Sequence, residues 1–129
     1  MTLPITSIYA ALTALLFLTL SIRVIVYRRT NTISLGDSGD KNLLKRMRAQ
    51  ANCAEYAPLA LILLMLSEFA AAPSLALHVL GVMLVAGRAL HAFGFASTPQ
   101  KIIFRQVGIL MNMVMIVFAA LGLLGHALL

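Results

Sequence analysis

The chain has 129 residues, of which 61% are hydrophobic and only 11% are charged, and its formal net charge is +6. This composition excludes an ordinary soluble domain and indicates one membrane-embedded domain over residues 1–129. The ten Lys and Arg residues fall in two blocks, 23–48 and 88–105, so the positive charge is confined to one side and gives no argument for a nucleic-acid partner.

Four apolar segments are each long enough to cross a hydrocarbon layer of roughly 30 Å, which takes about 20 helical residues. They cover residues 3–27, 53–70, 73–95 and 102–129. These continuous runs of Leu, Ala, Val, Ile and Met lack the alternation of membrane β-strands. We therefore predict an all-α membrane protein, a bundle of four transmembrane helices.

The connections contain the usual signals for helix starts. The second helix is expected to begin near Lys41, outside the hydrocarbon, with Ser38 or Asp40 as its cap. For the fourth helix we expect Thr98 as the cap and Pro99 at the first helical position. Both basic blocks include a connection on the same side, so the positive-inside rule places these connections in the cytoplasm and both termini outside it.

The second helix has one polar face. Arg48, Asn52 and Glu55 stand at i, i+4 and i+7, a spacing that puts them on the same side of a helix. An ionised Glu55 inside a bilayer is costly unless it is paired or faces a watery cavity. The sequence therefore predicts a polar pocket at this face, although a purely structural interhelical contact would use the same residues.

The third and fourth helices add polar side chains at the same depth. Arg88 and His91 come from the third helix, and Arg105 comes from the start of the fourth. Four helices make a thin bundle that shields few charges, so we expect the protein to form oligomers with these charges between subunits. For Arg88 a snorkelling anchor is the alternative, and for His91 we favour donation to a carbonyl over catalysis.

The residue types suit a small zwitterionic ligand. Arginine binds carboxylates in a bidentate fork, glutamate accepts from an ammonium group, and asparagine pairs with a peptide unit. Glutathione carries all three groups, and its thiol becomes a nucleophile as a thiolate, which a nearby cation favours. These residue types therefore fit glutathione as a ligand. We expect no metal site, because His78 and His126 are isolated near helix ends.

The stretch Arg48-Ala-Gln-Ala-Asn-Cys-Ala-Glu-Tyr-Ala-Pro58 closely resembles the helix-two signature of the MAPEG family, the membrane-associated proteins in eicosanoid and glutathione metabolism. The resemblance covers almost the whole chain as one MAPEG-like domain, and residues 34–37 look most like the small bacterial branch. It implies a homotrimer in the bacterial inner membrane, with glutathione between subunits near the cytoplasmic face. It also implies a lipophilic small-molecule substrate that reaches the site from the membrane lipids.

The resemblance also implies roles for particular residues on the second helix. Arg48, Asn52 and Glu55 match the glutathione-contacting residues of the family. Gln50 and Tyr56 match accessory positions in some members.

Residues on the other helices match the family less closely. Arg28 matches a helix-one arginine by its distance from the signature, with Arg23 as a rival. Arg88 and His91 complete the set expected to bind glutathione. Where several enzymes of the family have tyrosines on helix three, this chain has His91 and Phe95.

The candidate catalytic residue is Arg105, because the family's thiolate-stabilising arginine lies early in helix four and no other arginine is found there. In leukotriene C4 synthase the spacing would place that arginine at Ile102, so the correspondence is shifted. Two function classes follow from the resemblance. The first is a glutathione transferase or peroxidase acting on lipophilic electrophiles, and the alternative is a non-catalytic lipid- or glutathione-binding scaffold.

Overall fold

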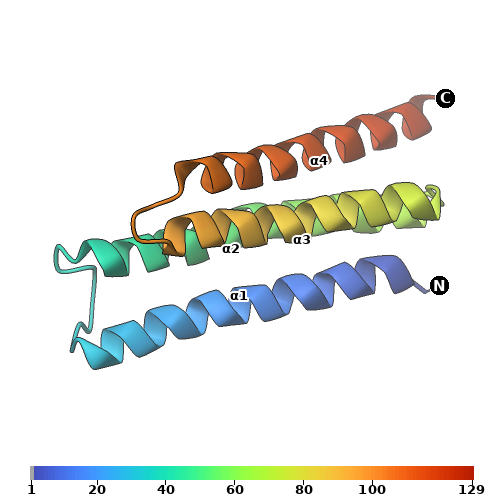
Figure 1. The fold of residues 1–129 in the computed structure, drawn as a ribbon. Coiled ribbons are helices and arrows are strands. Elements are labelled where there is room, and N and C mark those ends of the chain that lie inside the picture. The colour runs from blue at the N-terminus through green and yellow to red at the C-terminus, as the bar shows by residue number, and fades with distance from the viewer. Residues whose placement is uncertain (1) are drawn as a thin grey trace.

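The computed structural model describes residues 2–129. It consists of four α-helices, α1 (Pro4–Thr30), α2 (Lys41–Phe69), α3 (Ser74–Ala96) and α4 (Ile102–Leu128). They run alternately up and down, with the start of α1 and the end of α4 at one end of the bundle and the two longer connections at the other (Figure 1). All four helices are long and apolar enough to cross a membrane, so the predicted fold class is confirmed.

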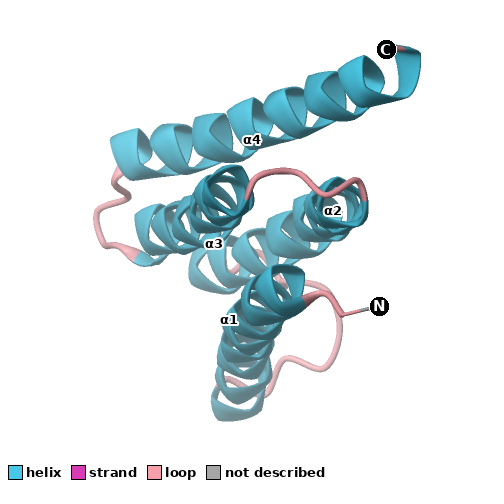
Figure 2. Ribbon diagram, turned by 90° about the vertical axis from the view of Figure 1, so that its right-hand side faces the viewer, coloured by secondary structure: helices cyan, strands magenta, loops and turns pink. Residues whose placement is uncertain are grey.

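The helices α2 and α3 form the middle of the bundle. Helix α1 packs on one side of this pair and α4 on the other, and within residues 2–129 α1 and α4 make no contact (Figure 2). The apolar core has two parts. One surrounds Tyr9, Leu64 and Leu84, and the other surrounds Leu20 and Cys53. Many remaining Leu, Ile, Val and Phe side chains face outward, which suits a surface in contact with lipid.

Two glycines allow α3 and α4 to approach closely. A Cβ atom on Gly108 would lie 2.5 Å from the carbonyl oxygen of Gly87 and 2.6 Å from the backbone nitrogen of His91. One turn further along α4, the fully buried Asn112 donates from Nδ2 to the carbonyl of Met83 at 2.9 Å. Helix α4 is thereby held against α3 beside the polar residues of the bundle.

Asp40 is the cap of α2. Its Oδ1 accepts from the backbone N–H groups of Asn42 at 2.8 Å and Leu43 at 3.1 Å, and its Oδ2 accepts from the Tyr27 hydroxyl at 2.9 Å. These bonds keep the pKa of Asp40 below its ordinary value, and the bond from the N–H of Leu43 has the largest effect. Of the two predicted caps, Asp40 is confirmed, while Ser38 has a positive φ of 49° in the connection before it.

The predicted cap of the fourth helix is wrong, although the predicted span starts correctly at residue 102. Helix α4 begins at Ile102 after Lys101, which provides no side-chain cap, and Thr98 and Pro99 lie in the connection. The chain first folds back on the end of α3, where the N–H of Lys101 donates to the carbonyl of Gly94 at 3.2 Å. A tertiary contact therefore decides where α4 begins, and local sequence signals do not.

At the opposite end of the bundle, Glu68 caps a helix other than its own. Its two carboxylate oxygens accept from the backbone N–H groups of Ile5 at 3.0 Å and Thr6 at 2.7 Å. The residue before α1, Leu3, provides no side-chain cap. The end of α2 thus satisfies the free N–H groups at the start of α1.

Candidate functional site

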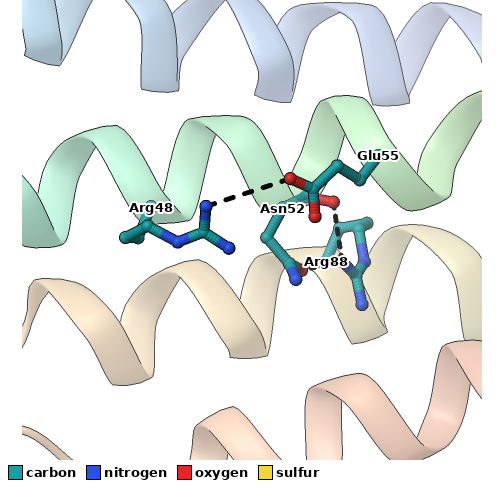
Figure 3. A network of polar contacts seen from close by, with 4 residues as sticks. All are labelled: Arg48, Asn52, Glu55 and Arg88. Atoms are coloured by element: carbon teal, nitrogen blue, oxygen red, sulfur yellow. Dashed lines mark hydrogen bonds and ion pairs between the residues drawn. The ribbon is translucent and has the colours of Figure 1, made fainter.

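The polar face of α2 is where the strongest sequence motif lies. Figure 3 shows Arg48, Asn52 and Glu55 on successive turns of this helix. Nη1 of Arg48 is 3.9 Å from Oε1 of Glu55, and these side chains are 53% and 54% exposed. The ion pair is therefore long and lies on the outside of the single chain.

Arg88 of α3 completes this polar group from inside the bundle. Its side chain is 1% exposed, and Nη1 donates to Oδ1 of Asn52 and, at 3.4 Å, to the backbone carbonyl of the same residue (Figure 3). The guanidinium carbon lies 5.2 Å from the ring centroid of Tyr56, which adds a cation–π contact. Within the described chain, Nε and Nη2 of Arg88 are buried and have no hydrogen-bond partner.

A second polar group joins the end of α3 to the start of α4. His91 is 2% exposed and donates from Nδ1 to the carbonyl of Arg105 at 3.2 Å, as the sequence analysis favoured. The guanidinium carbon of Arg105 lies 3.9 Å from the ring centroid of Phe95, and Nη1 donates to Oε1 of Gln100 at 3.1 Å. Arg105 is thus held at the edge of the bundle, on the ring of Phe95.

The position of Glu55 along α2 determines how costly its exposure is. At a rise of about 1.5 Å per residue, the 29 residues of α2 span about 43 Å, more than a hydrocarbon layer of about 30 Å. Counting about 20 residues back from Phe69 puts Glu55 inside this layer and Arg48 at its edge. A half-exposed carboxylate at this depth requires a polar covering that the single chain does not supply.

Comparison with known proteins identifies the family. The family model described as the MAPEG family matches residues 6–125. The chain belongs to the MAPEG family. It is similar to the inner membrane protein YecN of Escherichia coli strain K12, with 34% identity over 91 residues that cover 70% of each chain. The YecN protein of Escherichia coli O6:H1 is similar to the same extent. With its four apolar helices, this MAPEG protein is a multi-pass integral protein of the inner membrane.

Two further residues that the MAPEG resemblance implies for the site, Arg28 and Gln50, form no hydrogen bond or ion pair with Arg48 within the described chain. Arg28 of α1 donates to the carbonyl of Gly36 at 2.8 Å and contacts Sδ of Met47 at 3.3 Å, so it holds the first connection against α2. Gln50, two residues after Arg48 on α2, is half-buried. A role for either residue in ligand binding stays a prediction.

Two buried polar contacts are not marked by any local pattern in the sequence. Asn112 lies on the face of α4 that carries Gly108, and its role in bonding to α3 follows only from the packing of these helices. At the other end of the bundle, Nδ1 of His78 lies 2.9 Å from the Tyr9 hydroxyl. Over residues 2–129 there is no cluster of three or more His, Cys, Asp or Glu side chains that could hold a metal ion.

Proposed function

We propose that this MAPEG protein binds glutathione on the Arg48–Asn52–Glu55 face, between the subunits of a homotrimer. Glutathione then serves as co-substrate in a transferase or peroxidase reaction on lipophilic electrophiles that enter from the bilayer. The observation that carries the proposal is the Arg48–Glu55 pair, since both side chains are more than half exposed on a helix that crosses the membrane. A neighbouring subunit and a charged ligand would together provide the missing polar covering.

The geometry of the face supports a zwitterionic ligand. At 3.9 Å the Arg48–Glu55 pair is loose, so its guanidinium remains available to a carboxylate and its carboxylate to an ammonium group. The Oδ1 atom of Asn52 is engaged by Arg88, which leaves the Nδ2 group of Asn52 to donate to a peptide carbonyl. Three different groups of glutathione thus find partners within two turns of one helix.

A non-catalytic scaffold that binds glutathione or lipid is the second candidate function. It is favoured by the arrangement at the start of α4, where the guanidinium of Arg105 stacks on Phe95 and bonds to Gln100. His91, one turn before Phe95 on α3, donates from Nδ1 to the carbonyl of Arg105. In such a scaffold the ligand would bind without activation of its thiol.

Calorimetric titration of glutathione into the purified protein in detergent tests the binding site. Glu55→Gln removes the charge that faces the ammonium group and should weaken binding by about 1 to 3 kcal/mol, the range for a charged hydrogen bond. Glu68→Gln is the matched control, because it makes the same change at the other end of α2 and should leave the affinity unchanged.

The detergent-corrected mass of the same samples should correspond to three chains. A monomer that binds glutathione normally would contradict an intersubunit site. Loss of the trimer in Glu55→Gln, with normal binding by the remaining folded protein, would instead make Glu55 a structural contact. Turnover of a lipophilic aryl halide by the wild-type protein separates the enzyme from the scaffold.

A further inference from the structure

A groove of about 680 Å³ lies at the end of the bundle where α2 ends and α3 begins. Its walls come from this α2–α3 turn, the first turns of α3 and the last turns of α4. The walls are mostly apolar, with Leu80, Met83 and Phe118 among their large side chains, and only Ser67 and His126 contribute polar side chains. The groove shares no residue with the Arg48–Asn52–Glu55 face.

The groove exists because α4 diverges from α3 toward its C-terminal end (Figure 1). At Gly108 the two helices touch, since an added Cβ atom would lie 2.6 Å from the backbone nitrogen of His91. About four turns later, an added Cβ atom at Gly122 would have no atom within 4 Å. Gly122 lines the groove, as do the alanines Ala76 and Ala119. Small residues on both helices thus keep this space open.

The depth of the groove matches one leaflet of a bilayer. The ten residues from Pro73 at its mouth to Met83 at its far end correspond to about 15 Å of helix, which is half of a hydrocarbon layer of about 30 Å. At about 30 Å³ for each water-sized group, the groove holds about 20 non-hydrogen atoms, as in one long acyl chain. It therefore runs from the membrane surface toward the bilayer centre, in the direction an acyl chain takes.

The mouth of the groove offers hydrogen-bond donors. Helix α3 begins there without a side-chain cap and without an acidic residue in its first turn, so the first N–H groups of the helix are left free. Pro73 and Ala76 of this turn line the groove, and His126 lines it from α4. The start of a helix is a favourable place for a phosphate group.

The same end of the bundle also carries negative potential. Helix α4 ends at Leu128, and the last carbonyl groups of a helix have no partner within it, so they attract cations. The carboxylate of Glu68, next to Ser67, accepts from Ile5 and Thr6 at the start of α1. Donors and acceptors at one mouth suit a headgroup that carries both a phosphate and an ammonium group.

We propose that this groove binds phosphatidylethanolamine. One acyl chain lies between α3 and α4 as far as Met83, and the second remains in the surrounding bilayer. The phosphate lies at the first turn of α3 beside His126, and the ammonium group faces the carbonyl groups at the end of α4. The bound lipid fills the gap between the two diverging helices, and this site does not depend on glutathione.

Native mass spectrometry of the protein purified in mild detergent tests the headgroup. We expect one phosphatidylethanolamine to be retained per chain. After delipidation this lipid should bind about ten-fold more tightly than phosphatidylcholine or phosphatidylglycerol with the same acyl chains, the scale of one charged hydrogen bond. The choline group has no N–H to donate, and the glycerol group has no positive charge. Equal affinities for the three lipids, measured by thermal shift, would overturn the proposal.

A tryptophan in the groove tests the acyl chain without changing any charge. Gly122→Trp fills the groove and should abolish retention of phosphatidylethanolamine. Gly125→Trp is the matched control, because an added Cβ atom there also has no atom within 4 Å, but Gly125 does not line the groove. If tryptophan prevents folding, Gly122→Leu and Gly125→Leu make the same comparison. Equal retention by the two members of a pair would overturn the proposal, as would a wild-type protein that retains only single-chain lipids.

Discussion

The buried guanidinium of Arg88 donates a hydrogen bond to the side-chain oxygen of Asn52 across the contact between α3 and α2. This bond fixes which end of the Asn52 amide is free, since the oxygen is engaged and the NH2 group is left to donate. The buried arginine thus determines how the α2 face presents its amide to a ligand, although Arg88 itself is almost fully covered.

Replacing Arg88 by Met tests this role. The buried charge disappears together with its unpaired nitrogens, so the melting temperature should change little, because a buried ionic group is often replaced by an apolar one at small cost. Glutathione affinity, measured by calorimetry, should fall by about 1 kcal/mol as the amide of Asn52 becomes free to rotate. Arg88→Lys should restore part of the affinity. A large loss of stability with unchanged affinity would show that Arg88 is only structural.

The contact of Glu68 with the start of α1 gives a prediction about stability. Glu68→Ala removes the acceptor for the N–H groups of Ile5 and Thr6, and should lower the free energy of unfolding by about 1 kcal/mol, as for a lost helix cap. Glu68→Gln keeps one carbonyl oxygen and should be intermediate. Thermal unfolding in detergent, followed by circular dichroism, measures the difference. Equal melting temperatures for all three proteins would contradict this capping role.

The close approach of α3 and α4 predicts different outcomes for two glycines on one helix. In Gly108→Ala the new methyl group would meet backbone atoms of Gly87 and His91, which cannot move independently of α3, so the melting temperature should fall. A methyl group at Gly122 would have no atom within 4 Å. Gly122→Ala should therefore stabilise the helix by up to about 1 kcal/mol. If both variants melt alike, the interhelical contact does not matter for stability.

Much of the fold could be predicted from the sequence because each span must supply enough apolar residues to cross the bilayer. The predicted spans therefore agree with the helices to within a few residues, apart from the polar first turns of α2, whose start at Lys41 was predicted separately from its cap. The errors arise where distant segments meet. Thr98 and Pro99 have the local chemistry of a helix start, but the bond from Lys101 to Gly94 delays the helix.

For the candidate site, too, the sequence predicts which residues share a helix face but not which residues meet between helices. Helical periodicity alone places Arg48, Asn52 and Glu55 on one face of α2. Periodicity does not show that Arg88 reaches Asn52 instead of Glu55, because this depends on how α2 and α3 are rotated against each other. The contact between Glu68 and Thr6 joins residues 62 positions apart, and no local signal marks it.

Arg105 is the residue on which the choice between enzyme and scaffold depends. Its guanidinium now stacks on Phe95 and bonds to Gln100, at the edge of the bundle. If it turns toward a bound thiol, this cation should lower the pKa of the thiol below its free value of about 8.5. Ultraviolet absorbance of the thiolate across a pH series measures this pKa.

Arg105→Ala should then raise the pKa of the bound thiol and reduce turnover of a lipophilic electrophile, with little loss of glutathione affinity because Arg48 and Glu55 remain. Arg105→Lys should retain part of both effects, since a point charge can stabilise a sulfur anion even without the planar fork. Gln100→Ala is the control, because it frees the guanidinium from its hydrogen bond without removing the charge. An unchanged thiol pKa and unchanged turnover in Arg105→Ala would exclude Arg105 from the chemistry. Tight binding by a wild-type protein that shows no thiolate absorbance near neutral pH would instead favour the scaffold.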